Sequence, residues 1–214
     1  MVLVGDAMVG KSCFLRQFRQ GKFTFEHIPT ESTDFALKVI EHETETVKVQ
    51  LWDTSDSLRY GRLTKSYFTN VLGMAQAVIL MFDITEKKSF DNIDRWLETI
   101  MNMSSSEVII GLVGTKGDQD NMRQVPKEVA ATLAQGLGLE YFEVSAKDGE
   151  GINHAVNVLA AKVLELTQPP KSAIVRKRTP NPKESNQASE RGNSSIVNLN
   201  SADKENHKDC CKTS

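Results

Sequence analysis

Near the start of the chain lies a segment whose residue types and spacing could bind a polyphosphate. It reads Gly5-Asp6-Ala7-Met8-Val9-Gly10-Lys11-Ser12 and matches the pattern G-x-x-x-x-G-K-[ST]. Its glycines let backbone N–H groups wrap phosphates, and the N-terminus of a following helix adds a positive dipole end. Lys11 can reach the outer phosphates, and Ser12 can ligate Mg²⁺. The segment predicts a nucleotide site with Mg²⁺, and Cys13 joins it as a small apolar residue rather than a nucleophile.

Two later segments could identify the base of that nucleotide. Gly114-Thr115-Lys116-Gly117-Asp118 and Ser145-Ala146-Lys147 each follow a strand-like run. The Asp118 carboxylate can accept hydrogen bonds from the N1–H and the exocyclic amine of guanine, a pattern that adenine does not offer. Lys116 could lay its alkyl stem along the base, and the backbone of residues 145–147 could donate to the guanine carbonyl oxygen. In this order behind a phosphate loop, the two segments favour guanine.

Short apolar runs alternate with the helical patterns that must position these residues. Strand-like runs cover residues 2–5, 35–40, 47–52, 78–83, 108–114 and 141–144. Helical patterns cover residues 11–20, 63–71, 89–101, 127–135 and 152–166. This alternation predicts an α/β fold with a mostly parallel sheet, helices on both faces and a ligand at the carboxyl ends of the strands. The charged residues 41–45 look like a hairpin turn, so we expect one antiparallel pair at the sheet edge.

Composition favours one soluble globular domain followed by a tail. The chain has 214 residues, of which 39% are hydrophobic and 25% charged. Its longest apolar run, Ala77–Phe82, is far shorter than the roughly 18 residues of a membrane span. No secretory signal is visible at Met1, and three cysteines make no disulfide framework. We therefore expect a cytosolic compartment.

Residues 168–214 differ in character from the rest of the chain. They carry nine Lys or Arg and five Asp or Glu, which leaves 17 basic and 23 acidic residues for 1–167. They are rich in Ser, Asn and Pro and have few bulky apolar side chains, so they bury too little surface to offset the entropy of ordering. An acidic body with a flexible basic tail is the prediction.

Residues 1 to about 167 closely resemble the small GTPases of the Ras superfamily, and the Rab family in particular. The resemblance is carried by the phosphate loop, the two guanine segments and the motifs Asp34-Phe35, Lys48-Val49-Gln50-Leu51-Trp52-Asp53-Thr54, Tyr67-Phe68 and Leu80-Met81-Phe82-Asp83-Ile84-Thr85. It implies the six-stranded P-loop GTPase fold, with GTP or GDP and Mg²⁺ as ligands. It also implies that Phe23 packs edge-on against the base, that Thr30 ligates Mg²⁺ and senses the γ-phosphate, and that Asp53 holds Mg²⁺ through water.

In such a switch, Mg²⁺ and the γ-phosphate order two loops that relax after hydrolysis, so partners distinguish GTP from GDP. We expect these loops, and the mobile parts of the domain, at residues 24–34 and 54–66. The implied partners are effectors, exchange and GTPase-activating factors, and prenyl-escort and GDI-type proteins. No nucleic-acid partner is expected.

The second of these loops departs from the family pattern. Where the family has Asp-x-x-Gly followed by a catalytic Gln, this chain has Asp56 and Ser57 in place of the Gly and the Gln. The glutamine orients the attacking water, and Ser57 is too short to do so. A carboxylate about 5 Å from a phosphate charge is repelled by roughly 3 kcal/mol at an effective dielectric of about 20, unless Asp56 turns toward solvent or Arg59. The candidate catalytic residues are therefore Lys11, Thr30 and Ser57, and slow hydrolysis is expected.

Milder departures occur elsewhere in the G domain. Ala7 and Met8 stand where Ser or Gly is frequent, and Met8 could crowd the incoming water or a partner's arginine. Thr115 stands where Asn is commonest, although Rho-type GTPases also use Thr. The chain is a few residues longer than the Rab pattern between Phe68 and Val78, and its abrupt first strand leaves open that it is a fragment of a larger protein.

Two adjacent cysteines, Cys210 and Cys211, stand within the last five residues. Rab-like proteins are doubly geranylgeranylated on such pairs, and two lipid chains anchor a protein stably where one is marginal. The basic Arg176-Lys177-Arg178 could add attraction to anionic lipid. The expected location is the cytoplasmic face of intracellular membranes, with a cytosolic pool.

Three functions stay open on these residues. The first is a membrane-anchored Rab-like switch of vesicle traffic that hydrolyses GTP to GDP slowly. The second is a guanine-nucleotide-binding interaction module with little or no hydrolysis, for which Asp56 and Ser57 are the discriminating residues. The third, a phosphate-loop kinase, is disfavoured by the guanine segments.

Overall fold

Parallel strands with almost no polar side chains form the centre of the fold, because both of their faces are covered by helices. The computed structural model describes residues 1–24, 34–42, 45–54, 70–104 and 107–167. Every described residue belongs to one compact unit, residues 1–173. The strands are β1 (Val2–Gly5), β2 (Asp34–His42), β3 (Glu45–Asp53), β4 (Ala77–Asp83), β5 (Ile109–Thr115) and β6 (Glu140–Glu143).

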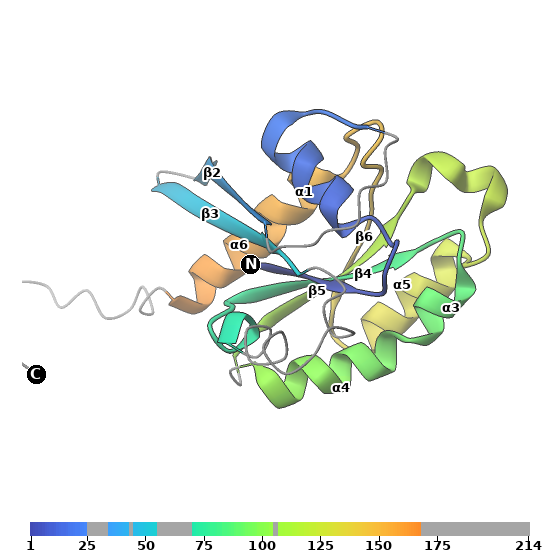
Figure 1. Ribbon diagram of the computed structural model, residues 1–214. Helices are drawn as coiled ribbons and strands as arrows, with labels where there is room; N and C mark the ends of the chain where they lie inside the picture. The colour runs from blue at the N-terminus through green and yellow to red at the C-terminus, as the bar shows by residue number, and fades with distance from the viewer. Residues whose placement is uncertain (25–33, 43–44, 55–69, 105–106, 168–214) are drawn as a thin grey trace, which may run out of the picture. The chain divides into compact units, whose positions relative to one another are not determined.

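The strands form one six-stranded sheet in the order β2-β3-β1-β4-β5-β6 (Figure 1). β1 pairs in parallel with β3 and β4, and β5 pairs in parallel with β4 and β6. Only β2 and β3 are antiparallel, from Asp34 opposite Asp53 to His42 opposite Glu45. The predicted mostly parallel sheet and its antiparallel pair at one edge are confirmed. Turn residues 43 and 44 lie outside the described residues.

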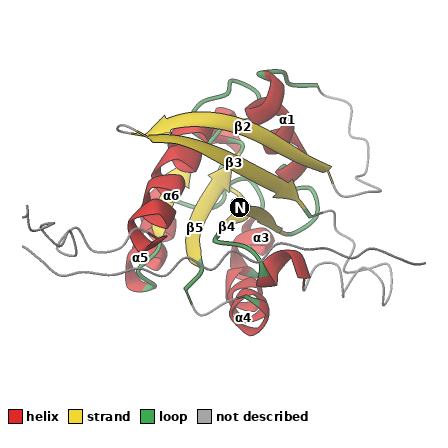
Figure 2. Ribbon diagram, turned by 90° about the vertical axis from the view of Figure 1, so that its left-hand side faces the viewer, coloured by secondary structure: helices red, strands yellow, loops and turns green. Residues whose placement is uncertain are grey.

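Helices cover both faces of the sheet, as predicted (Figure 2). The helical elements are α1 (Lys11–Gln20), α3 (Lys87–Asp91), α4 (Ile93–Met103), the 3₁₀ helix η2 (Gly117–Met122), α5 (Lys127–Gly136) and α6 (Ile152–Thr167). Side chains alternate along β1, so that Val2 and Val4 pack with α4 and α5 while Leu3 packs with α1 and α6. Among the described residues, no helix is long and apolar enough to span a membrane.

The helix predicted over residues 89–101 is wrong in one respect, because two helices occupy this stretch. α3 and α4 are separated by Asn92, whose backbone has φ −86° and ψ −1°. The Asn92 side chain donates a hydrogen bond to Asp6 over 2.6 Å, so this residue serves a tertiary contact rather than a continuous helix. An apolar helical pattern does not register such a break.

The described residues before β4, in the segment that the sequence predicts to be longer than the Rab pattern, form an ordered turn. Residues 70–73 are helical, and the chain then turns so that Gln76 O accepts from Ile109 N over 3.1 Å. Leu72 in this turn is fully buried, whereas Met74 is 82% exposed. This turn packs onto the core through Leu72 and Ala75, with Val71 against the same cluster. Most of the helix predicted over residues 63–71 lies outside the described residues.

We predict that Gly111→Ala destabilises the fold, because a Cβ on this β5 residue would lie 2.8 Å from a methyl group of the buried Leu159 on α6. The expected loss is about 1–3 kcal/mol of unfolding free energy, measured by urea denaturation. The matched control is Gly136→Ala in α5, where a Cβ meets nothing within 4 Å. That variant should gain up to about 1 kcal/mol from helix propensity. Equal losses in both variants would contradict the packing argument.

Candidate functional site

The loop between β1 and α1 has a backbone that few side chains tolerate. Gly5 has φ 147°, and a Cβ there would lie 2.2 Å from Met81 O on β4, so only glycine fits. Gly10 has φ 99° and Met8 has φ 69°. Met8 therefore holds a left-handed conformation at some cost in strain, and its side chain is exposed. These residues shape a concave turn at the carboxyl end of β1.

The Lys11 side chain lies inside this turn and bonds to its carbonyl oxygens. It begins α1, is only 7% exposed, and its Nζ donates to Gly5 O over 2.9 Å and to Asp6 O over 2.7 Å. These bonds hold the loop carbonyls on the ammonium. A buried cation inside a loop at a helix N-terminus is the electrostatic setting that a phosphate requires.

Ser12 and Asp53 meet beside this turn. The Ser12 hydroxyl donates to Asp53 Oδ2 over 2.6 Å, and Asp53 is 1% exposed. Asp53 Oδ1 is buried and has no hydrogen-bond partner among the described residues. Burial raises the pKa of the Asp53 carboxyl, while the Ser12 bond and the charge of Lys11 oppose the rise. An orphaned buried oxygen beside a hydroxyl is a donor set that fits a hard cation such as Mg²⁺.

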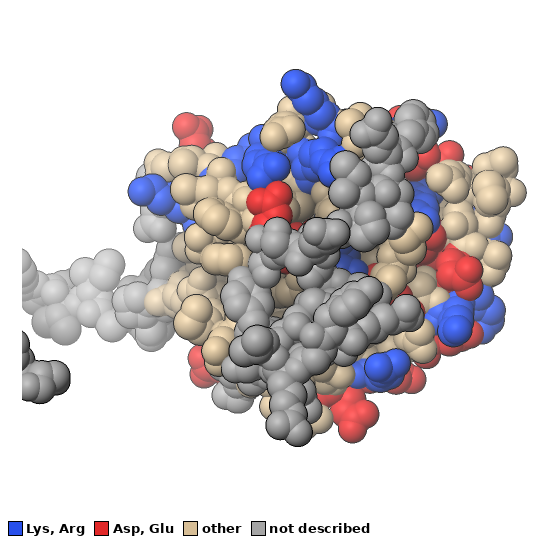
Figure 3. Space-filling view, in the orientation of Figure 1, with Lys and Arg blue, Asp and Glu red and all other residues tan. Residues whose placement is uncertain are grey.

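Basic residues follow the turn along α1. α1 has no acidic residue in its first turn and carries Arg16 and Arg19, with Lys22 just beyond it. On the face shown in Figure 3, Lys and Arg side chains gather over α1 and the adjoining strands. Arg19 pairs with Asp34 on β2 at 3.1 Å. These arginines lie farther along α1 and Lys22 lies beyond it, so the positive charge at the loop itself comes from Lys11 and from the helix N-terminus.

Two side chains fix the loop to the rest of the sheet. The Asp6 carboxylate accepts from Asn92 Nδ2 over 2.6 Å and from the Trp96 indole N–H over 2.8 Å. The Thr115 hydroxyl lies 2.6 Å from Val9 O and 3.0 Å from Phe82 O. Thr115 thus ties the end of β5 to the phosphate loop, which gives its unusual residue type a structural role.

The second half of the site lies at the carboxyl ends of β5 and β6. The Ser145 hydroxyl donates to Asp118 Oδ1 over 2.9 Å, and Lys147 Nζ lies 3.8 Å from Asp118 Oδ2. Lys116, with φ 61°, forms an ion pair with Asp83 at the end of β4. The Asp118 side chain is 11% exposed, so its carboxylate is held in place and partly desolvated. Such a carboxylate can accept two hydrogen bonds from a base edge.

The remaining predicted residues of the two segments lie nearby. Ala146 and Cys13 are half-buried, as is Phe23 beyond the end of α1. Burial raises the pKa of the Cys13 thiol, and the charges of Arg16 and Lys116 oppose the rise. A thiol with a raised pKa suits a packing residue rather than a nucleophile.

The structure therefore brings the phosphate loop, Ser12 and Asp53 together. It joins Asp118 to Ser145 and Lys147, whereas Thr115 bonds to the phosphate loop and Lys116 pairs with Asp83. Five predicted residues lie outside the described residues: Thr30, Asp56, Ser57, Cys210 and Cys211. The same holds for residues 25–33 and 55–66 of the predicted mobile loops. The roles of all these residues stay predictions.

Sequence reasoning missed three residues that support the site. Asp83 could have been found, because it ends a buried strand at the same sheet edge as Asp53. Asn92 and Trp96 gave no signal, since both lie inside one predicted amphipathic helix, where an Asn and an indole fit ordinary packing.

The chain matches the family model described as "Ras family" over residues 1–165, which contain every described site residue. It is 37% identical over 164 residues to the Ras-related protein Rab-13 of Mesocricetus auratus, covering 77% of this chain and 79% of that protein. It is 36% identical over 163 residues to the GTP-binding protein ypt2 of Schizosaccharomyces pombe, covering 76% and 80%. It is 35% identical over 165 residues to the Ras-related protein SEC4 of Candida albicans, covering 77% of each.

We predict that Asp53→Asn stabilises the nucleotide-free protein while removing its response to Mg²⁺. The substitution deletes a buried, incompletely paired carboxylate, which costs about 1–3 kcal/mol. Urea denaturation at pH 7, after removal of nucleotide with EDTA and phosphatase, measures the gain. With GDP present, Mg²⁺ should raise the midpoint of the wild type and not that of the variant.

The pH dependence has a defined sign. Because the Asp53 pKa is raised, the native state binds a proton at pH values where the unfolded state does not, so nucleotide-free wild type should gain stability as the pH falls through that pKa. Asp53→Asn should lack this contribution. The control Asp94→Asn, on the exposed face of α4, should change stability by less than about 1 kcal/mol. A destabilised Asp53→Asn variant would contradict the prediction.

Proposed function

The chain belongs to the Ras family as a Rab-like small GTPase, and from that premise we propose that it is a guanine-nucleotide switch of vesicle traffic that hydrolyses GTP slowly. The observation that carries the nucleotide assignment is the pairing of two sites at one sheet edge. One combines a lysine-filled loop with a buried hydroxyl–carboxylate pair, and the other presents the Asp118 carboxylate. Together they suit the two ends of a guanine nucleotide.

The roles follow from the atoms present. The phosphate loop and Lys11 would bind the β- and γ-phosphates. Asp118 would select guanine by accepting hydrogen bonds from the N1–H and the exocyclic amine of the base. Ser12 and Asp53 would hold Mg²⁺, together with Thr30 if the resemblance extends to it. When bound, Mg²⁺ supplies positive charge to phosphate oxygens.

Slow turnover rests on residues 56 and 57. Hydrolysis needs a side chain that orients water toward the γ-phosphate, and the serine side chain places its hydroxyl two bonds closer to the backbone than a glutamine amide. The Asp56 carboxylate would add repulsion toward the γ-phosphate. We propose that the protein holds GTP for long periods unless a partner assists hydrolysis.

An exposed apolar surface on β2 and β3 suits an effector. Phe35 and Trp52 stack with ring centroids 4.9 Å apart. Phe35, Leu37 and Val39 are 45%, 58% and 52% exposed and alternate along the edge strand β2. Contiguous exposed apolar side chains mark interaction surfaces. Because β2 directly follows the proposed first switch, a partner on this surface would also contact residues that respond to GTP.

We further propose that residues 1–167 are the nucleotide-binding domain and residues 168–214 a tether lipidated at Cys210 and Cys211. The relatives are Rab proteins, and a paired-cysteine end on a basic tail suits two prenyl chains. Prenyl-escort and GDI-type proteins would then be partners, with exchange and GTPase-activating factors acting on the switch. The proposed location is the cytoplasmic face of intracellular membranes, with a cytosolic pool.

We predict that Ser57→Gln accelerates GTP hydrolysis, because glutamine restores a water-orienting amide. A gain of at least about tenfold is expected, which corresponds to about 1.4 kcal/mol of activation free energy. Single-turnover hydrolysis at saturating Mg²⁺ measures it, with Ser55→Gln in the same loop as the control. A wild-type rate near that of ordinary Rab proteins would refute slow turnover. No hydrolysis in either protein would favour the alternative, a guanine-nucleotide-binding interaction module.

We predict that the double variant Cys210→Ser, Cys211→Ser moves from membranes to the cytosol, because it loses both lipid attachment sites. Cell fractionation of the full-length chain measures the shift. Cys13→Ser is the control and should leave the membrane fraction unchanged. Unaltered membrane association of the double variant would exclude the lipid anchor.

A further inference from the structure

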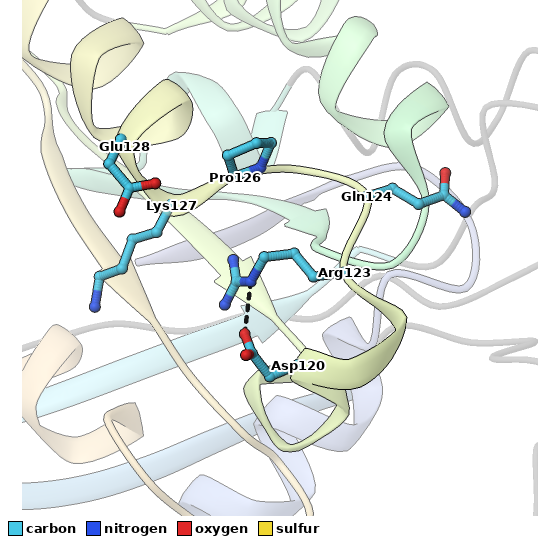
Figure 4. A pocket seen from close by; sticks show the side chains of 6 residues that line it. All are labelled: Asp120, Arg123, Gln124, Pro126, Lys127 and Glu128. Atoms are coloured by element: carbon cyan, nitrogen blue, oxygen red, sulfur yellow. Dashed lines mark hydrogen bonds and ion pairs between the residues drawn. The ribbon is translucent and has the colours of Figure 1, made fainter.

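An ion-paired cluster joins the two guanine-reading segments outside the atoms that would touch the base. Arg123 donates through Nη1 to Glu143 Oε1 over 2.9 Å and through Nη2 to Glu143 Oε2 over 3.0 Å. The Tyr141 hydroxyl donates to Glu143 Oε1 over 2.6 Å. Arg123 Nε also donates to Asp120 Oδ1 over 2.6 Å, as Figure 4 shows along the wall of an open pocket. Both oxygens of one carboxylate are thus fixed by a planar guanidinium.

The cluster is largely removed from water. The Arg123 and Glu143 side chains are 18% and 14% exposed. Hydrogen bonding to Glu143 raises the pKa of Arg123. For Glu143, burial alone would raise the pKa, but the bonds from Arg123 and Tyr141 outweigh it and lower the pKa. Burial and the bond to Glu143 raise the pKa of Tyr141. All three groups therefore keep their charge states over the physiological range.

The Arg123–Glu143 pair links the two segments that would contact guanine. Arg123 follows Asp118 by five residues, directly after the end of η2, and Glu143 ends β6 two residues before Ser145. The segments meet again between them, where Gly117 N donates to Val144 O over 3.0 Å and Ser145 Oγ donates to Asp118. The bidentate Arg123–Glu143 pair therefore adds a further link between the segment that carries Asp118 and the segment that carries residues 145–147.

Stability alone is a weak reason for such a pair. Buried ion pairs often add little net stability, because desolvation offsets their attraction. Their planar geometry instead fixes orientation. The proposed guanine site needs fixed orientation, since the Asp118 carboxylate and the 145–147 backbone must meet opposite edges of one flat base.

We propose that Arg123 and Glu143 are positioning residues for guanine selection: their bidentate pair sets the distance between the Asp118 carboxylate and the 145–147 backbone, and so controls guanine selectivity and nucleotide residence time. This inference rests on the proposed function. It assigns Tyr141 a smaller part, because its hydroxyl only restrains the Glu143 carboxylate.

The test compares Glu143→Gln with Glu140→Gln in the full chain. Both change a β6 glutamate, but Glu140 makes an exposed pair with Lys162 at 2.7 Å, with both side chains 42% exposed. The dissociation rates of GDP and IDP are measured in the presence of Mg²⁺. IDP is the comparison because its base lacks the exocyclic amine from which Asp118 would accept a hydrogen bond. Glu143→Gln should release GDP roughly tenfold faster and reduce the preference for GDP over IDP. Glu140→Gln should leave both quantities unchanged.

Two milder variants keep the test decisive if Glu143→Gln folds poorly. Arg123→Lys keeps the charge but loses the bidentate bond, and Tyr141→Phe removes one hydroxyl. Both should shift GDP release and the GDP-to-IDP preference in the same direction by smaller factors. Equal acceleration of GDP and IDP release would indicate general loosening and overturn the positioning role, as would variants that match Glu140→Gln. Wild-type protein that fails to prefer GDP over ADP would instead overturn the proposed function itself.

Discussion

A loop proposed to bind phosphate must be held in place while its ligand-facing N–H groups stay available, and several contacts of this domain meet that constraint. Lys11 holds the carbonyls of Gly5 and Asp6, Thr115 reaches the carbonyl of Val9, and Asn92 and Trp96 hold the Asp6 carboxylate. All of these contacts use loop oxygens and none of them uses a loop N–H. The loop is therefore fixed through carbonyl oxygens and the Asp6 carboxylate, by Lys11, by Thr115 at the end of β5, and by Asn92 and Trp96 at the start of α4.

The site also concentrates polar groups that do not favour folding by themselves. Asp53 carries a buried carboxyl oxygen without a partner among the described residues, and Met8 holds a left-handed backbone. The surrounding sheet supplies the compensation, because β4 is buried at every position between two helical layers. In parallel α/β sheets the apolar middle of a central strand stabilises the fold, while the loops at the carboxyl ends of the strands carry the strained and charged residues that bind ligands. Binding of nucleotide and cation to the native state would then raise its free energy of unfolding.

Most of the fold, and the candidate residues of the phosphate loop and guanine segments, could be predicted from local patterns. The phosphate loop, the guanine segments and the alternation of strands and helices are all encoded within short windows, so their prediction needed no tertiary information. Contacts between distant residues were not predictable in this way. Asn92 breaks a helical pattern because it reaches Asp6, and Arg123 finds Glu143 only because β5 and β6 are neighbours. Thr115 was a mild departure from the usual Asn, and no local pattern indicated that its hydroxyl lies within hydrogen-bond distance of Val9 O in the phosphate loop.

The tryptophans of this chain have an optical consequence. The sequence contains two, Trp52 and Trp96, and they occupy different working parts of the molecule. The Trp96 indole donates directly to a carboxylate of the phosphate loop, and Trp52 stacks on Phe35 at the half-exposed edge of the sheet. Their intrinsic fluorescence would therefore report separately on the phosphate loop and on the proposed effector surface. The protein carries two native, label-free probes, each of which can be isolated by replacing the other with phenylalanine.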